Sequence, residues 1–91
     1  MNRTAFLAHL NVEGQTLEFW LEQQWLVPAR AASDMSFSET DLARARLIQD
    51  LKTSFGVNEE GVDIILHLLD QLHGFRRAFE DLHTELKSPR G

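Results

Sequence analysis

Three side chains in the second half of the chain, His67, Asp70 and His73, are of types that bind metal ions or transfer protons. They stand three residues apart in a stretch whose apolar spacing predicts one long helix. At about 100° per residue, six residues turn through about 600°, so the two histidines lie about 120° apart around the helix. Side chains placed in this way do not easily share a metal ion. We interpret them as ordinary helix-surface residues, with an interface role or, less readily, a metal site as the alternatives.

The rest of the sequence carries no signature of an enzyme. It has no glycine-rich phosphate loop, no nucleophile elbow and no His-Glu-x-x-His pair of metal ligands. It also has no cysteine, which excludes disulfides, thiolate metal sites and cysteine nucleophiles. We therefore expect no catalysis, no cofactor and no bound metal.

A different kind of site is indicated by residues 16–28, TLEFWLEQQWLVP. The positions predicted to face inward at helical spacing are Leu17, Trp20 and Leu21. Outside that face lie Glu18, Phe19 and Glu22. An aromatic ring among carboxylates is typical of a surface that anchors a basic protein partner. The alternative is that Phe19 packs under the first helix or under a neighbouring hairpin.

Two short helices joined by a tight turn are predicted at the amino-terminal end, as a helix-turn-helix pair. Thr4 is expected to cap the first helix, over residues 5–10. A break at residues 11–15 follows, and Thr16 is expected to cap a second helix that closes just before Pro28. Both tryptophans of this region are expected in the core, with a role as binding anchors as the alternative.

The pattern changes in residues 28–37, PARAASDMSF. The turn-forming residues Ser33 and Asp34 stand between two flanks of about three residues each. A small β-hairpin is the prediction for this segment, and an irregular loop is the alternative.

A capping box, Ser38 with Asp41 three residues later, predicts the start of a third helix. Its buried stripe is expected to consist of Leu42, Ala45, Ile48 and either Leu51 or Phe55. Gly56 is expected to end this helix, and Asn58 to cap a fourth. The acids that suit the positive start of that fourth helix are Glu59, Glu60 and Asp63.

The fourth helix is predicted to run to about Lys87 and to carry a dimerisation surface. Apolar residues recur at a seven-residue interval at Ile65, Leu72, Phe79 and Leu86. Val62 and Leu69 fill the companion position of the first two heptads. At ~1.5 Å per residue this helix reaches ~40 Å, longer than the ~26 Å expected for so small a domain. The residues expected to contact a second copy are Leu72, Phe75, Phe79, Leu82 and Leu86, in either parallel or antiparallel orientation.

The charge of the chain is acidic throughout. The formal net charge is -5, with five Lys and Arg against seven acids up to Ser54, and four against seven after it. Neither part looks suited to phosphate, so nucleic acid is not the expected partner. No apolar run is long enough for a membrane span, and a cytoplasmic protein is the expectation. The expected fold class is mainly α, with a helix-turn-helix region over residues 1–56 and the long helix over residues 57–91 in one compact domain.

This layout resembles the MerR-like winged helix-turn-helix domain. The segment TLEFWLEQQWLVP is similar to that family's TLRYYE-type segment ending in GLLPP. In this comparison Glu18 stands where the DNA-binding members carry arginine, and Phe19 and Trp20 stand at aromatic positions. Met35 and Ser36 fall in a wing that normally carries arginine. A carboxylate facing phosphates is repulsive, so these departures argue against DNA.

A closer resemblance is to the chaperone modulator CbpM family, and it extends over about residues 5–86. It is carried by FLAHLNVEGQTLEFWLEQQWLVP, FSETDLARARLIQDL, FGVNEEGVDIILHLLDQL and HGFRRAFEDL. The resemblance implies a small, non-enzymatic homodimer. It also implies binding to the J-domain of a DnaJ-like co-chaperone, CbpA, which restrains the stimulation of the Hsp70 DnaK.

Two acidic patches are candidates for J-domain binding, because a J-domain presents a basic helix to Hsp70. The first patch consists of Glu18, Phe19 and Glu22. The second patch consists of Asp63, His67 and Asp70. The alternative function is a MerR-type DNA-binding transcriptional regulator, in which contacts from Arg30, Arg44 and Arg46 would have to offset the acidic helix.

Overall fold

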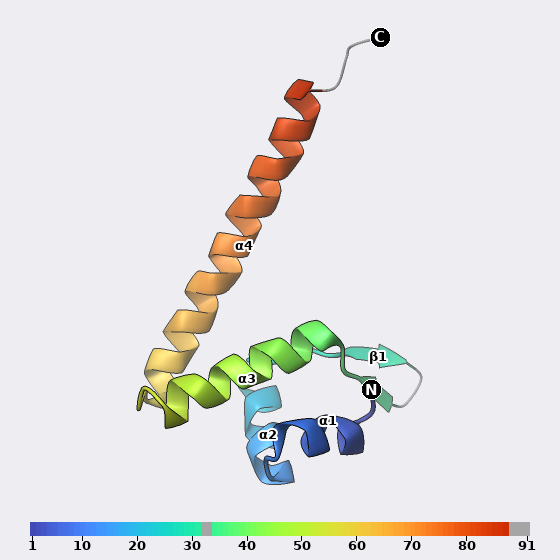
Figure 1. Cartoon of the computed structure of the whole chain (residues 1–91), viewed down its shortest axis with the longest axis vertical. Helices are drawn as coiled ribbons and strands as arrows, with labels where there is room; N and C mark the ends of the chain where they lie inside the picture. Colours follow the sequence, from blue (N-terminus) through green and yellow to red (C-terminus); the bar gives the residue numbers. More distant parts are fainter. Residues whose placement is uncertain (32–33, 88–91) are drawn as a thin grey trace.

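The computed structural model describes residues 1–31 and 34–87 of the chain. These residues form four helices and a two-stranded hairpin, which confirms the mainly α fold class. The elements are α1 (Arg3–Leu10), α2 (Gly14–Glu22), β1 (Ala29–Ala31), β2 (Asp34–Ser36), α3 (Glu39–Thr53) and α4 (Glu59–Lys87). The first three helices and the hairpin gather into a body, and α4 rises from it as an arm (Figure 1).

The first two helices begin earlier than the sequence predicted. Asn2, not Thr4, caps α1, because its side-chain oxygen accepts a hydrogen bond from the backbone N–H of Ala5 at 2.8 Å. The second helix begins at Gly14, and no side chain caps it. The prediction that Thr16 caps this helix was therefore wrong, since Thr16 lies inside its first turn.

The second helix ends before the residues that were expected to close it. Its last residue is Glu22, and Gln24 has a left-handed backbone with φ of 61°. Trp25 then returns toward the helix, where its N–H donates to the carbonyl of Trp20 at 3.0 Å. Trp25 and Leu26 thus enter the core from a turn, not from the helix.

The hairpin predicted between residues 28 and 37 is confirmed. The two strands are antiparallel, with Arg30 opposite Met35. Asp34 belongs to β2 and not to the turn, and Ser33 lies outside the described residues. The strand pair is held near the chain start, since the amino terminus donates to the carbonyl of Phe37 at 2.6 Å.

The third helix and the start of the fourth follow their predicted capping signals. Ser38 and Asp41 form the expected capping box, and Leu42, Ala45 and Ile48 are buried. Phe55 is not part of this stripe, because its side chain is 73% exposed beyond the end of the helix. After Gly56, with φ of +65°, Asn58 caps α4 by accepting from the N–H of Gly61 at 2.8 Å.

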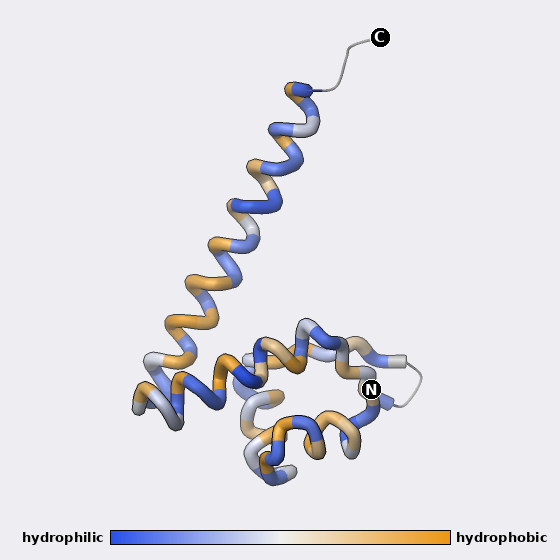
Figure 2. The backbone as a smooth tube through the Cα atoms, in the orientation of Figure 1, coloured by the Kyte–Doolittle hydropathy of each residue, from blue (hydrophilic) through white to orange (hydrophobic). Residues whose placement is uncertain are grey.

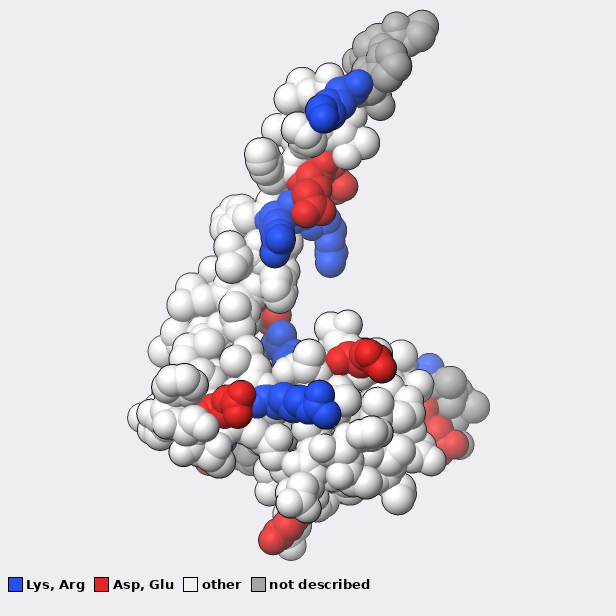
Figure 3. Space-filling model, viewed as in Figure 1, with Lys and Arg blue, Asp and Glu red and all other residues white. Residues whose placement is uncertain are grey.

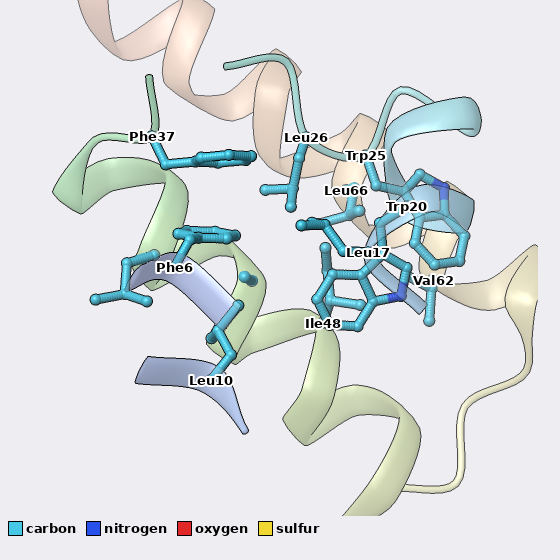
Figure 4. Close-up of a cluster of buried hydrophobic side chains, with 12 residues drawn as sticks. Phe6, Leu10, Leu17, Trp20, Trp25, Leu26, Phe37, Ile48, Val62 and Leu66 are labelled. Atoms are coloured by element: carbon cyan, nitrogen blue, oxygen red, sulfur yellow. The ribbon is translucent and has the colours of Figure 1, made fainter. Parts of the chain in front are cut away.

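The core joins all four helices to the turn before β1 and to the residue that follows β2. The rings of Phe6 and Phe37 stack with centroids 4.1 Å apart. Beside them, side chains from α2, α3 and α4 converge around Trp20 (Figure 4). Both tryptophans are 2% exposed, which confirms their core placement. The remaining labelled members are Leu10, Leu17, Trp25, Leu26, Ile48, Val62 and Leu66.

Only the first part of α4 contributes to this core. Val62 and Leu66 are its buried residues, and every described residue from Asp70 onward is exposed. Hydrophobic positions nevertheless recur along the arm to its end (Figure 2). Within residues 1–31 and 34–87, no helix combines the length and the apolar character needed to cross a membrane.

Candidate partner-binding surface

A hollow lies where the end of α2 meets the start of α4, with a volume of about 370 Å³. Its lining consists of Phe19, Gln23, Glu59, Glu60, Asp63 and Ile64. Three carboxylates and two large apolar side chains therefore share one open surface, which we call the acidic hollow. Such a surface suits a ligand that carries a positive charge on an apolar stem.

Phe19 forms part of the wall of the acidic hollow and also supports the core. Its ring meets the ring of Trp25 edge to face, with centroids 5.6 Å apart and an interplanar angle of 86°. The ammonium group of Lys52 lies 6.0 Å from the centroid of each ring. Phe19 is therefore half-buried against Trp25.

Two acids of α4 fasten the arm to the body. Asp63 accepts a hydrogen bond from the indole N–H of Trp25 at 3.0 Å. Asp70 receives two hydrogen bonds from Arg44 of α3, at 2.7 and 3.1 Å. The Nε–H of Arg44 also donates to the carbonyl of Trp25. Arg44 thus joins α3, the turn after α2 and α4 in one network.

This network changes the proton affinity of Asp70. The hydrogen bonds from Arg44 hold the pKa of its carboxyl below the ordinary value, although partial burial opposes the change. The positive charge of Arg44, and smaller effects from His73 and His67, act in the same direction as the hydrogen bonds. Asp70 therefore stays ionised and paired at neutral pH.

The Arg44–Asp70 pair gives a pH-dependent prediction for Asp70→Asn. Because folding lowers the pKa of Asp70, its contribution is complete above the unfolded value of about 4 and disappears as the pH falls through the folded value. Asp70 is 55% exposed, so the expected loss at pH 7 is below about 1 kcal/mol. Urea unfolding of both proteins should show a difference at pH 7 that shrinks below pH ~4. Glu22→Gln, at an exposed acid of α2, is the control, and a gap that widens in acid would contradict the prediction.

The residues of the two predicted patches are grouped differently in the structure. Glu18 does not line the acidic hollow and forms an ion pair with Arg3 of α1. Glu22 is exposed at the end of α2. Phe19 of the first patch and Asp63 of the second instead line the same hollow. The other two members of the second patch, His67 and Asp70, line a neighbouring hollow with Arg44.

Four residues of the acidic hollow were not predicted as part of a site: Gln23, Glu59, Glu60 and Ile64. The sequence spacing could have indicated part of this site, because residues 59, 60, 63 and 64 share one side of a helix. From the sequence, Glu59 and Glu60 are expected only as acids that suit the positive start of α4. Among the described residues, no group of three or more His, Asp or Glu side chains is arranged to hold a metal ion.

A second exposed surface runs along α4, and we call it the apolar stripe. It consists of Leu68, Leu72, Phe75, Phe79, Leu82 and Leu86, each 54 to 76% exposed. Their spacing alternates between four and three residues, as in a coiled-coil seam. Val62, which fills the companion position of the first heptad, is fully buried in the core and does not belong to the apolar stripe. Leu69 is half-buried against that core, and Leu68 takes the outer position.

The charges on the face shown in Figure 3 are mixed, with Lys and Arg in separate places between Asp and Glu. No broad basic surface covers this side of the body. The predicted wing carries Arg30, which is exposed, opposite Met35. This surface offers little that would collect phosphates.

Comparison with known families identifies the chain at the level of its fold. A model of the MerR HTH family of regulatory proteins matches residues 1–84. Neither curated proteins nor solved structures gave a significant match. The match includes the helix-turn-helix pair, the hairpin and nearly all of α4. The chain therefore belongs to the MerR HTH family of regulatory proteins.

Proposed function

We propose that this protein is a chaperone modulator of the CbpM type. In this proposal it binds the J-domain of a DnaJ-like co-chaperone and covers the basic helix that the J-domain presents to Hsp70. The observation that carries the proposal is the acidic hollow, in which Glu59, Glu60 and Asp63 surround Phe19 and Ile64. The proposal also rests on the sequence resemblance to the CbpM family over most of the chain.

The chemistry of the acidic hollow favours a lysine or arginine from the partner. The aliphatic stem of such a side chain packs on Phe19 and Ile64 while its charge meets the carboxylates. Glu59 and Glu60 lie in the first turn of α4, where the helix dipole favours negative charge. Lys52 already lies 3.7 Å from Glu59, which supports the view that this surface attracts cations.

The side chains of the acidic hollow are held in place by contacts within the chain. Asp63 is held by the indole of Trp25, and Phe19 is held by the ring of the same residue. A rigid surface loses little conformational freedom on binding. The acidic hollow therefore supports a defined docking site better than a set of mobile surface acids would.

Charge reversal at Glu60 tests the docking site. We expect Glu60→Lys to weaken J-domain binding by about 10-fold, because a rim carboxylate becomes a like charge facing the basic helix. Asp81→Lys, the same change of charge sign far along the arm, is the matched control and should bind as the unmodified protein does. Isothermal titration calorimetry with an isolated J-domain measures both. Equal affinities for the two variants would count against the acidic hollow.

The salt dependence of the same titration tests the electrostatic part of the proposal. Rim charges are screened over about 10 Å at 0.1 M salt, so affinity should fall as the salt concentration rises. An affinity that does not change with salt would remove the acidic hollow as the basis of binding.

A second candidate function, DNA binding, is favoured by the family to which the chain belongs. Arg30 and Arg46 are exposed and available for phosphates, but Arg44 is engaged with Asp70. The exposed side of α2 carries Glu18 and Glu22, which repel a phosphate backbone. A gel shift at low salt separates the two functions. We expect no complex with duplex DNA at micromolar protein, and a stable complex would favour the regulator.

We also propose that the protein works as a homodimer through the apolar stripe. Six large apolar side chains exposed in a row are unusual for a monomer and typical of an interface. A second copy of the same helix matches both the length and the spacing of this surface.

A further inference from the structure

The side chain of Lys52 lies at the edge of the acidic hollow. Its ammonium group is 3.7 Å from the carboxylate of Glu59 and 6.0 Å from the centroids of the Phe19 and Trp25 rings. Glu59 and Phe19 both line the hollow. A positive group of the chain itself therefore already lies beside a carboxylate and an aromatic ring that the hollow offers to a partner.

We propose that Lys52 is an internal competitor for the acidic hollow, which a basic partner must displace from Glu59 in order to bind. This inference rests on the proposed function and adds to it a control on the affinity of the same site. Most changes at a binding surface weaken binding. Neutralising Lys52 does the opposite, because it removes a positive charge that competes with the partner.

The fold keeps Lys52 beside Glu59. Lys52 lies in the last turn of α3 and Glu59 in the first turn of α4, so each charge is at the helix end whose dipole favours it. The corner between the two helices is closed by a hydrogen bond from the N–H of Val57 to the carbonyl of Leu51, at 2.8 Å. Because both groups belong to one short stretch of the chain, their pairing does not cost the translational freedom that a partner loses.

The contact between Lys52 and Glu59 is open enough to be exchanged. The side chain of Lys52 is 33% exposed and that of Glu59 is 58% exposed. Ion pairs that reach solvent in this way are weak, and a cation near an aromatic ring at such a site adds only a small further attraction. Lys52 therefore lowers the affinity of the hollow for a partner without closing it.

The other two acids of the hollow are left for the partner. Within residues 1–31 and 34–87, neither Glu60 nor Asp63 forms an ion pair, although Asp63 accepts the indole N–H of Trp25. A partner cation that replaces Lys52 at Glu59 only exchanges one ion pair for another. The net gain must come from further positive charges that reach Glu60 and Asp63. The competitor thus favours a partner with several basic side chains over one with a single basic group.

J-domain affinity tests the competition. Lys52→Met keeps a long, unbranched side chain and removes the charge, and we expect it to bind an isolated J-domain about 5-fold more tightly in isothermal titration calorimetry. The matched control is Lys87→Met, which removes the same charge at the exposed end of α4 and should bind as the unmodified protein does. Lys52→Arg keeps the charge and should show no gain. Binding by Lys52→Met that is no tighter than binding by Lys87→Met would overturn the proposal.

Nuclear magnetic resonance of methylated lysines tests the position of Lys52 without a partner. Methylation keeps the positive charge, and Lys52 and Lys87 are the only lysines of the chain. We expect the isotope-labelled methyl signal of Lys52 to be displaced from that of Lys87 by the nearby rings, and Phe19→Leu to reduce this displacement. Added J-domain should move the Lys52 signal toward that of Lys87. Coinciding signals in the free protein, or a Lys52 signal that stays unchanged in the complex, would contradict the competition.

These measurements separate the competition from the proposed function. If Glu60→Lys weakens J-domain binding and Lys52→Met leaves it unchanged, the competitor is overturned and the proposed function stands. If neither the unmodified protein nor Lys52→Met binds a J-domain, the proposed function fails and the competition fails with it. In that case the spectrum of the free protein still decides whether Lys52 lies beside the two rings.

Discussion

Replacing Phe79 with glutamate should convert the protein from a dimer to a monomer. Phe79 is 62% exposed in a single copy, at the centre of the outer half of the apolar stripe. In the proposed dimer its ring is buried against the apolar stripe of the second copy. Glutamate removes that burial and places a charge in an apolar contact, so we expect the dimer to weaken by at least about 100-fold. Light scattering should give a mass near 10.4 kDa at concentrations where the unmodified protein gives twice that value.

The control for this prediction is Thr84→Glu. Thr84 lies on the same stretch of α4 but away from the apolar stripe, and it receives the same added charge. This variant should keep the dimer mass. A dimer mass for Phe79→Glu would show that the stripe is not the interface between copies.

Replacing Phe6 with alanine should have the largest effect on folding. Phe6 is fully buried, and its ring stacks on Phe37 beside the strand that ends at Ser36. Removing a buried ring of this kind costs about 3 to 5 kcal/mol, because the cavity left behind is only partly filled. That loss is a large fraction of the stability of a small domain. We expect the midpoint of urea unfolding, followed by circular dichroism, to fall sharply.

Phe55→Ala is the matched control for the core. It removes the same side chain at a position that is 73% exposed, so the expected change is within about 0.5 kcal/mol. Both variants must be compared at one protein concentration, because dimerisation adds to apparent stability. Equal midpoints for the two phenylalanine variants would contradict the assignment of the core.

Helix starts could be predicted where a capping residue was followed by acids of the first helical turn. Ser38 with Asp41, and Asn58 before an acidic turn, located the starts of α3 and α4 correctly. At the amino terminus two residues, Asn2 and Thr4, were both able to cap, and the sequence does not say which one the chain uses. Only the folded geometry chooses Asn2.

The two apolar surfaces of α4 could not be separated from the sequence, because both follow helical spacing. Val62, Leu66 and Leu69 face the body, whereas Leu68 and Leu72 face outward. The inward and outward rows lie close to each other on the helix, so a seven-residue pattern fits either one. The distinction depends on which side the body covers, and that is a property of the tertiary structure.

The chemistry of the candidate site could be predicted from the sequence, but the residues that form it could not. Carboxylates around Phe19 were expected from the sequence, but the acids beside it come from α4 and not from α2. Phe19 is directed there by Trp25, which reaches the core from the turn after α2. Phe19 and the acids of α4 are far apart in the chain, so whether they meet depends on how α2 and α4 cross. Helical periodicity within one element does not contain that information.

The central claim, that this protein covers the J-domain and so withholds it from Hsp70, is tested most directly by the ATPase rate of Hsp70. A fixed amount of DnaJ-like co-chaperone stimulates that rate, and the protein is added in increasing amounts. We predict that the rate falls to its unstimulated level near equimolar protein and co-chaperone, and that Glu60→Lys requires about 10-fold more protein. A stimulated rate that stays unchanged at a large excess of the protein would contradict the account.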